Sequence, residues 1–332
     1  FGSRQFLTCF LSSEVSMRLV SFVPLAAADF GQPVVAYYSG ISLDTVKAGG
    51  VNALSLAFFS PEAMSDPRCD FTDPNTPCVK PASGAGGQLG FNWAVNVMTT
   101  AADDLAANAG AGASKGTVLF SFGGLTEGGA AWDKIFSTPT AAAQFGKNAA
   151  ALVAAATTAA KGVVTVGIDL DVEGTTSELP HFDAFIAAFR QDAAYEKVPL
   201  MLCSLSGLAD PASADNYKVG LLQQHGPSNK GVTWLNMMVN NVASSCDDMS
   251  KFWRDERLEF LPSSNLVLGM WGLNNAAWIL KDPGCTDGSD PLFPWMKKTG
   301  AGFGIWQWWS GDPSPIKAVV DQVKQGGAPT LV

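Results

Sequence analysis

Residues 162–174 read "GVVTVGIDLDVEG", an apolar run that passes without a turn signal into three alternating acids. Continuous apolar strands are typical of a parallel sheet that is buried on both faces. Alternate residues of a strand share one face, so Asp169, Asp171 and Glu173 point to the same side, with neighbours about 7 Å apart. The stretch therefore predicts a buried parallel strand that ends in a row of carboxyl groups.

Seven further segments have the same apolar or β-branched character. The eight expected strands are 33–38, 51–59, 116–122, 162–172, 198–205, 231–239, 265–272 and 302–308. Helical stretches lie between or after them, at 86–109, 140–160, 179–193, 213–224 and 314–325. Alternating strands and helices in this number predict an α/β fold, a (β/α)8 TIM barrel in a single domain. A doubly wound open sheet is the alternative, but no G-x-G-x-x-G follows the first strand.

Composition and charge exclude several classes of protein. The chain has 332 residues, of which 47% are hydrophobic and 15% charged, a globular and not a disordered composition. The net charge of −9 argues against a nucleic-acid surface. After the first 30 residues, no apolar run is long enough to cross a membrane. We expect a monomer that binds neither nucleic acid nor membrane and needs no cofactor.

The amino-terminal segment differs from the rest of the chain. Residues 17–28, "MRLVSFVPLAAA", combine a basic start, a short apolar run and an Ala-x-Ala end, which resembles a secretory signal peptide. A disordered leader is the alternative. We expect residues 1–29 to be a leader, residues 30–332 to form the catalytic barrel domain, and the protein to be secreted.

The cysteines outside the leader divide into loop and strand positions. Cys69 and Cys78 flank a turn-rich loop, and Cys246 and Cys285 lie in two later loops, so both pairs are expected as disulfides on the catalytic side. Cys203 lies in an apolar run and is expected to be a buried free thiol. No spacing of Cys and His predicts a zinc site.

The row of acids indicates proton chemistry. Active sites of TIM barrels lie at the carboxyl ends of the strands, where this row is expected. Three acids on one inward face repel each other, so they are expected to share a proton and to raise the pKa of at least one carboxyl group. A carboxylic acid kept protonated near neutral pH is a general acid. A site for a hard cation such as Ca²⁺ or Mg²⁺ is the alternative.

"GIDLDVEG" (167–174) also resembles the D-G-x-D-x-D-x-E signature of family 18 glycoside hydrolases, the chitinase family. Other segments are similar to the family's strands in the same order. They are "VVAYYSG" (34–40) for the first strand, "LSLAFF" (54–59) for the second, "SFGG" (121–124) for the third and "GFGIW" (302–306) for the eighth. The resemblance spans about residues 33–325.

The resemblance implies a role for each residue of the row. Glu173 would protonate the glycosidic oxygen, Asp171 would hydrogen-bond the N–H of the substrate's 2-acetamido group, and Asp169 would hold Asp171 or share its proton. The acetamido oxygen would then attack the anomeric carbon, a substrate-assisted exception to the scheme with two catalytic carboxylates. Trp306 would lie under the sugar at the cleavage point. The full set of implied substrate contacts is Tyr37, Phe58, Gly123, Gly124, Met237, Asn240, Trp271 and Trp306.

Two departures from the family pattern affect these expectations. Val166 replaces the first Asp of the signature, an inner, supporting position whose loss is expected to shift acidity without abolishing the chemistry. The family's tyrosine on the sixth strand is replaced in "NMMVNN" (236–241) by Val239 or Asn240, depending on the alignment.

The sequence therefore leaves two functions open. One is a chitinase, a retaining hydrolase of β-1,4-linked N-acetylglucosamine polymers, slowed by the missing tyrosine. The other is a catalytically weak or inactive chitinase-like lectin that binds N-acetylglucosamine oligosaccharides.

Overall fold

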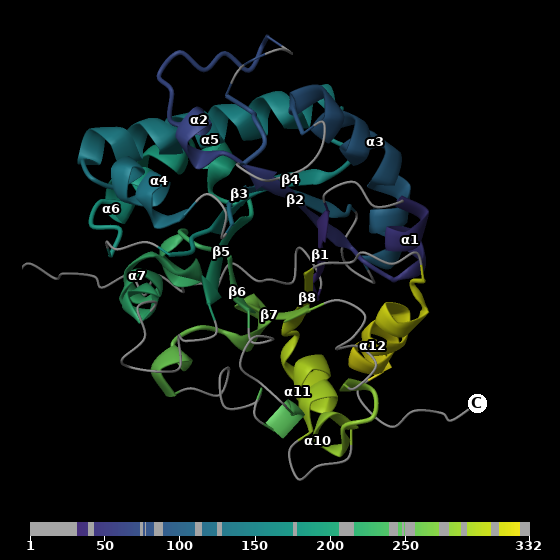
Figure 1. Cartoon of the computed structure of the whole chain (residues 1–332). Coiled ribbons are helices and arrows are strands. Elements are labelled where there is room, and N and C mark those ends of the chain that lie inside the picture. Colours follow the sequence, from purple (N-terminus) through teal and green to yellow (C-terminus); the bar gives the residue numbers. More distant parts are fainter. Residues whose placement is uncertain are drawn as a thin grey trace, which may run out of the picture.

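Eight parallel strands close into a barrel in the computed structural model of the chain (Figure 1). They are β1 Val34–Tyr38, β2 Ala53–Phe59, β3 Thr117–Gly123, β4 Thr165–Asp171, β5 Leu200–Leu205, β6 Trp234–Met238, β7 Leu266–Trp271 and β8 Gly302–Trp306. Each strand pairs with the next in sequence, and β8 pairs with β1. The predicted TIM barrel is confirmed, and each strand lies within a few residues of its expected bounds.

The structure describes residues 32–38, 43–73, 76, 78–82, 89–109, 115–124, 128–174, 178–205, 216–238, 245–247, 249, 256–271, 279–286, 291–306 and 312–325. The expected leader, residues 1–29, lies outside this part of the chain, so the signal peptide stays a prediction.

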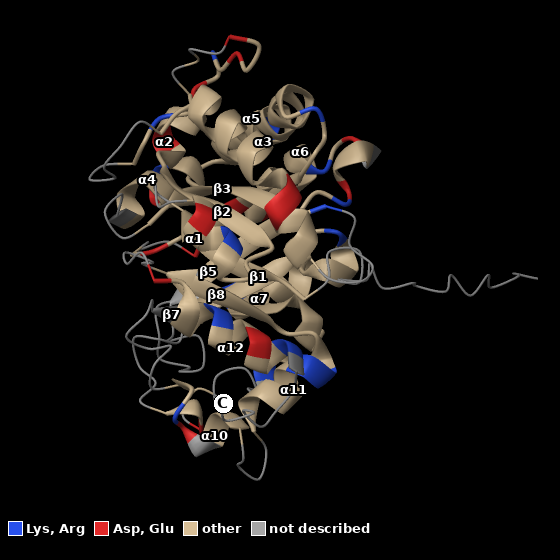
Figure 2. Cartoon of the chain, turned by 90° about the vertical axis from the view of Figure 1, so that its right-hand side faces the viewer, with Lys and Arg blue, Asp and Glu red and all other residues tan. Residues whose placement is uncertain are grey.

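Helices surround the barrel as an outer layer (Figure 1). They are α1 Leu43–Ala48, α2 Pro61–Met64, α3 Phe91–Asn108, α4 Gly128–Ile135, α5 Pro139–Ala159, α6 Phe182–Phe189, α7 Tyr217–His225, α10 Pro283–Thr286, α11 Leu292–Thr299 and α12 Ser314–Gln325. Local sequence starts two of them, since the hydroxyls of Ser60 and Thr138 cap α2 and α5 and a proline follows each cap. Most of the ribbon coloured as Lys, Arg, Asp or Glu lies in the helices and loops around the barrel (Figure 2). None of the described helices has the length and apolar character needed to cross a membrane.

Two hydrophobic clusters occupy the two faces of the strands. The larger one packs the strands against the helices and includes Ile168 and Leu170 of β4. The smaller one fills the barrel, and its buried members are Val35, Tyr37, Ala53, Ala57, Leu119, Met201, Cys203, Trp234 and Val267. Alternation along each strand therefore sends one set of residues to the helices and the other to the interior.

This alternation changes two sequence-based expectations. Val166 packs in the outer cluster, on the face of β4 opposite Asp169, so it does not occupy the inner position expected for it. Met237 is also fully buried in the outer cluster, and the structure does not bring it to the interior. Its neighbours Asn236 and Met238 have the opposite parity, and Met238 packs on the inner cluster. The expectation of a Met237 side chain on the substrate side is therefore not supported.

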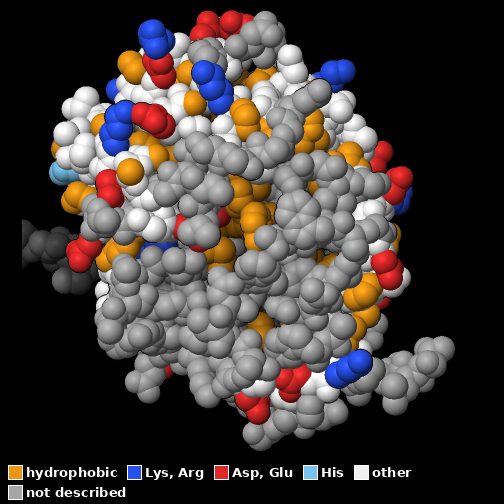
Figure 3. Space-filling view, viewed as in Figure 1, with side chains coloured by type: hydrophobic (Ala, Val, Ile, Leu, Met, Phe, Trp, Pro, Cys, Tyr) orange, Lys and Arg blue, Asp and Glu red, His pale blue; other side chains and the backbone are white. Residues whose placement is uncertain are grey.

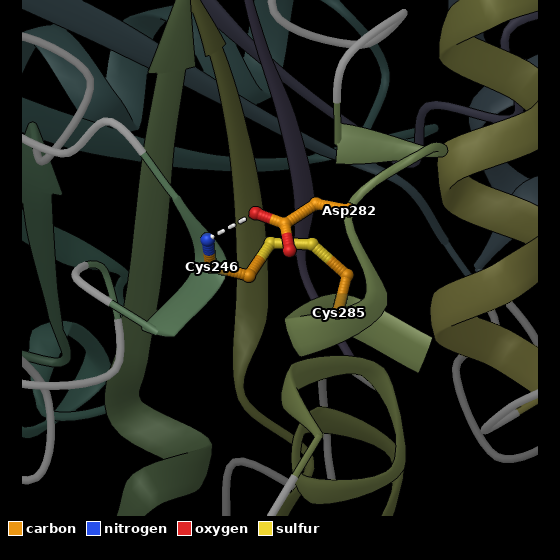
Figure 4. Close-up of side chains that lie close together, drawn as sticks. All are labelled: Cys246, Asp282 and Cys285. Atoms are coloured by element: carbon orange, nitrogen blue, oxygen red, sulfur yellow. Dashed lines mark hydrogen bonds between the residues drawn. A yellow bond between two sulfur atoms is a disulfide. The ribbon is translucent and has the colours of Figure 1, made fainter. Parts of the chain in front are cut away.

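Both expected disulfides are present. Cys69 and Cys78 join two parts of the segment after β2, with Cα atoms 5.6 Å apart. Cys246, after β6, joins Cys285 in α10, after β7, with Cα atoms 5.3 Å apart. All four cysteines follow the carboxyl ends of strands, as predicted. Figure 4 shows the second bridge with Asp282, whose carboxylate accepts a 2.7 Å hydrogen bond from the main-chain N–H of Cys246.

Candidate active site

Asp169 lies at the centre of the barrel and is fully buried. Its Oδ2 atom accepts hydrogen bonds of 2.7 Å from the hydroxyls of Ser55 and Ser121, and its Oδ1 accepts from the Cys203 thiol at 3.3 Å. Burial raises the pKa of Asp169, while the hydrogen bonds lower it. Because both oxygens accept from neutral donors, the surroundings fit a carboxyl group that exchanges a proton better than a ligand of a hard cation.

The hydrogen-bond network continues across the barrel from Cys203. Tyr37 Oη and Cys203 Sγ are 2.7 Å apart, and the Asn236 amide donates to both at 2.8 and 3.3 Å. These residues come from β1, β5 and β6, so they meet only through the interior. Burial, followed by the charge of Asp169, raises the pKa of both the Tyr37 phenol and the Cys203 thiol well above their ordinary values. Cys203 is the buried free thiol that the sequence predicts, and both groups stay neutral at physiological pH.

Asp171 lies one step further toward the carboxyl end of β4, at its last residue. It is 2% exposed, and no donor among the described residues bonds its Oδ1 atom. Burial raises the pKa of Asp171 well above its ordinary value, the charges of Glu173 and Asp169 raise it further, and the charge of Lys218 lowers it. The predicted shared proton thus has a physical basis in Asp171 and its two acidic neighbours, Glu173 and Asp169.

Glu173, the third acid, lies two residues beyond β4 and is half-buried. Its charge acts on Asp171, so the two carboxyl groups lie close enough to interact. The row therefore runs from a sealed interior at Asp169 to a partly open position at Glu173. That gradient of exposure suits a group that exchanges protons with a bound molecule.

The glycines of the "SFGG" segment fit closely around this row. Gly123 has φ +110°, and a Cβ there would lie 2.2 Å from the Asp171 carbonyl oxygen and 2.9 Å from the Trp132 ring. Gly124 has φ +85°, and its Cβ would lie 2.9 Å from the Phe58 ring. Both positions require glycine for backbone conformation and for space. The structure shows close packing of the two glycines against Asp171 and Phe58, and their predicted contact with the substrate stays a prediction.

Three aromatic side chains gather at the carboxyl ends of β1, β2 and β8. The ring centroids of Tyr37 and Trp306 are 5.4 Å apart with an edge-to-face angle of 83°, and those of Phe58 and Trp306 are 5.1 Å apart. Phe58 and Trp306 are only partly buried. Figure 3 shows hydrophobic side chains near the middle of the face that Figure 1 views. The predicted trio is therefore brought together, with apolar ring surface beside the acids.

Three predicted positions remain, Trp271 on the seventh strand and Val239 and Asn240 after the sixth. Trp271 is the last residue of β7 and pairs with Trp306 of β8. Asn240 and Val239, the two candidates for the family's tyrosine position, lie outside the described residues.

Sequence reasoning missed Lys218, the second residue of α7. Its side chain is fully buried, and its ammonium donates to the main-chain carbonyls of Val172 at 2.7 Å and Cys203 at 3.0 Å. No hydrophobic pattern or motif marks this lysine, because its partners lie 46 and 15 residues away in the sequence.

No family model and no curated protein sequence matches the chain. Solved structures do match it. A GH18 chitinase from Pseudoalteromonas aurantia has a TM-score of 0.58 at 16% identity, over 87% of this chain and 99% of the other. The fold is that of the GH18 chitinases. A class V chitinase mutant from Nicotiana tobaccum in complex with NAG4 has a TM-score of 0.53 at 12% identity, over 88% and 98% of the two chains. The Bacillus cereus spore cortex-lytic enzyme SleL has a TM-score of 0.55 at 9% identity, over 89% and 74%.

Within this GH18 chitinase fold, the acids of β4 and the aromatic trio meet at one end of the barrel. The only set of metal-type ligands found among the described residues is Cys246, Asp282 and Cys285, and its two sulfur atoms are joined in the disulfide. The described acids of β4 can transfer protons, and the aromatic rings beside them offer an apolar surface for stacking.

Proposed function

We propose that the protein is a retaining chitinase that cleaves β-1,4-linked N-acetylglucosamine polymers. The observation that supports this most is the row Asp169, Asp171 and Glu173, which passes from the closed interior to the aromatic groups at the strand ends. The likeness in fold to solved GH18 chitinases is consistent with the proposal.

In the proposed reaction, Glu173 gives its proton to the glycosidic oxygen as the bond to the anomeric carbon breaks. The substrate's acetamido oxygen forms the new bond to that carbon, which gives an oxazolinium ion. A water molecule then opens the ion and returns a proton to Glu173, with net retention at the anomeric carbon. The protein needs one acid and one orienting carboxylate, because the substrate supplies the nucleophile.

Asp171 has the orienting role in this scheme. Its Oδ1 atom, which no described donor bonds, is available to accept the N–H of the acetamido group. Asp169 cannot take this role, because both of its oxygens already accept hydrogen bonds from buried side chains. We therefore assign Asp169 to proton sharing with Asp171 and to holding it in place.

The aromatic trio would bind the sugar. The apolar face of a pyranose ring stacks on aromatic rings, and the partly exposed Trp306 is held at a fixed angle by its edge contact with Tyr37. Phe58 is fixed in turn by its close approach to Gly124. A preordered platform lowers the entropy that binding costs.

A chitinase-like lectin is the alternative, and the sixth strand supports it. Neither Val239 nor Asn240 offers the phenol that the family uses to hold the acetamido oxygen. A lost donor to a developing charge costs about 3 kcal/mol, so we propose a slow enzyme.

We also propose that the protein acts outside the cell. Two disulfides are typical of proteins that fold in an oxidising compartment, and the segment 17–28 has the pattern of a signal peptide.

The test is incubation with N-acetylglucosamine hexamer, with mass spectrometry of the products and NMR of the anomer first released. Shorter oligomers released as the β-anomer support the chitinase. Binding without cleavage would replace it with the lectin. If the protein neither binds nor cleaves the hexamer, both functions are rejected.

A further inference from the structure

Lys218 places a positive charge in the closed part of the molecule, beside the acids. Its side chain has no exposed surface. An ammonium group without partners costs several kcal/mol to bury, so a fully buried lysine must be compensated by its surroundings. The Val172 and Cys203 carbonyl oxygens, at 2.7 and 3.0 Å, supply part of this compensation.

Of these two carbonyls, one belongs to Val172, directly after β4, and the other to Cys203 in β5, at the point where the pairing of the two strands ends. The β4–β5 register runs through Ile168–Leu200, Asp169–Met201 and Leu170–Leu202. Beyond it, the Lys218 ammonium bonds the Val172 oxygen just after β4 and the Cys203 oxygen in β5. One of these oxygens belongs to Val172, which lies between Asp171 and Glu173. Lys218 therefore fixes the main chain that carries both acids.

The charge of Lys218 also acts on Asp171. Burial raises the pKa of Asp171 most, followed by the charges of Glu173 and Asp169, and the charge of Lys218 opposes them. The other titratable groups that face the acids, Tyr37 and Cys203, have pKa values raised by burial and stay neutral. The centroid of the Tyr217 ring lies 5.9 Å from the ammonium. Lys218 is thus a buried cation whose charge acts on Asp171.

We propose that Lys218 is a positioning residue for the reaction. Its ammonium holds the main chain at Val172 against β5 and biases the proton shared by Asp171 and Glu173 toward Glu173. This inference rests on the proposed function, because it assigns to Lys218 the distribution of the proton that the proposed reaction uses. Without the cation, Asp171 competes more strongly for that proton and loses its ability to accept the acetamido N–H.

The test compares Lys218→Met, which keeps the length and removes the charge, with Lys317→Met on the exposed surface of α12. We expect kcat for hexamer hydrolysis to fall about 10- to 100-fold in Lys218→Met, with KM changed less than about threefold, because the aromatic platform is untouched. The acidic limb of the pH–rate profile should move up by about one pH unit. Wild-type values in a folded Lys218→Met variant would overturn the proposal.

Two further variants cover the case in which the methionine variant does not fold. Lys218→Gln keeps a hydrogen-bond donor and removes the charge, so it should show the same displaced limb, whereas Lys218→Arg keeps the charge and should keep the wild-type limb. A displaced limb in Lys218→Arg, or an unmoved limb in Lys218→Gln, contradicts the proposal.

A measurement without turnover separates this proposal from the proposed function. The Asp171 carboxyl carbon is titrated by ¹³C NMR in the wild type and in the most conservative folded neutral variant. A higher pKa in the neutral variant supports the role of Lys218 even if the wild type cleaves nothing, and an equal pKa rejects it. Absence of hydrolysis by the wild type, in contrast, rejects only the proposed chitinase.

Discussion

The main-chain N–H of Gly124 donates a 3.0 Å hydrogen bond to the carbonyl oxygen of Asp171. The bond joins the end of β3 to the end of β4, directly beside the row of acids. It is possible only because Gly123 and Gly124 have positive φ values of +110° and +85°. The two glycines of the "SFGG" segment therefore support the main chain at Asp171, without a side chain of their own.

Gly123→Ala should destabilise the protein strongly. The added methyl group would lie 2.2 Å from the Asp171 carbonyl oxygen and 2.9 Å from the buried Trp132 ring, in a backbone conformation that alanine rarely adopts. Strain and overpacking of this kind cost about 2–4 kcal/mol together. Urea unfolding measures the loss, and activity of the folded fraction should also fall because β4 must move.

Gly220→Ala is the matched control for this substitution. Gly220 lies inside α7, and a Cβ there would meet nothing within 4 Å. Alanine in a helix interior is favoured over glycine by up to about 1 kcal/mol. An equal loss of stability in the two variants would contradict the packing role of Gly123.

Glu173→Gln should lower the rate of hydrolysis by about 100-fold or more, because it keeps the shape of the side chain and removes the proton that the reaction transfers. The rate is measured with N-acetylglucosamine hexamer, and circular dichroism confirms the fold. Glu178→Gln, an exposed acid in the loop that follows, is the control and should keep the wild-type rate. Hydrolysis at the wild-type rate by Glu173→Gln would remove Glu173 from the mechanism.

Asn240→Tyr should increase the rate of hydrolysis, and Val239→Tyr should not. Asn236 and Met238 of β6 face the interior of the barrel, and we predict from this parity that position 240 corresponds to the family's tyrosine. A phenol there recovers part of the roughly 3 kcal/mol that a missing donor costs. Binding of the hexamer, measured by calorimetry, should stay within about threefold in both variants. If Val239→Tyr alone is faster, the parity argument fails.

Asp171→Asn should change how stability depends on pH. Asp171 is protonated to a higher pH in the folded chain than in the unfolded chain, where Asp titrates near pH ~3.9. Above that pH, the folded chain therefore holds a proton on Asp171 that the unfolded chain has lost. The contribution of Asp171 to the free energy of unfolding is complete at low pH and is lost as the pH rises and Asp171 ionises in the folded chain. The melting temperature of Asp171→Asn minus that of the wild type should increase from about pH 4 to pH 7.

Asp312→Asn should show the opposite change of stability with pH to that of Asp171→Asn. Hydrogen bonds from Ser314, the main-chain N–H first, lower the pKa of Asp312. A carboxylate with a lowered pKa stabilises the fold above its unfolded pKa, so this variant should lose relative stability as the pH rises. The effect should be small because Asp312 is exposed to solvent. Trends of the same sign in both variants would contradict the assignment of Asp171.

The two disulfides should differ in their contribution to stability. Cys246 and Cys285 are 39 residues apart, and Cys69 and Cys78 are 9 apart. In the chain-entropy account, replacing both cysteines of a pair by alanine costs about 4 kcal/mol for the longer loop and about 2.5 kcal/mol for the shorter one. Denaturant unfolding measures both losses. Peptide mapping without reduction checks the pairing, which four free thiols would refute.

The barrel was predictable because its strands are continuous apolar runs with helical segments between them, a pattern that local sequence carries. The row of acids on β4 was predictable for the same reason, since alternation along one strand places Asp169 and Asp171 on one face. Alternation also decides against Met237 and Val166, which pack toward the helices. The residue types of the family pattern suggested these two positions, and the parity of the folded strands corrects them.

The contacts between distant strands were not predictable. Lys218 bonds Val172 across 46 residues, and Tyr37 meets Cys203 across 166, with no local pattern that marks either pair. Cys203 is the buried free thiol that was expected, and the contact that the sequence did not indicate is its hydrogen bond to Asp169. Such contacts depend on how strands face one another around the closed barrel, which a single sequence does not encode in any short segment.

Because Cys203 is enclosed in the barrel, the rate at which its thiol reacts measures how often the barrel opens. Cys203 is the free cysteine of the described chain and has no exposed surface, so a thiol reagent reaches it only when strands separate. The labelling rate of Cys203 therefore depends on opening of the barrel itself, and motions of the loops at the ends of the strands do not change it. A sugar that binds across β1, β4 and β8 should lower the labelling rate of Cys203 as its occupancy rises. The labelling rate would then measure binding without any substitution in the site.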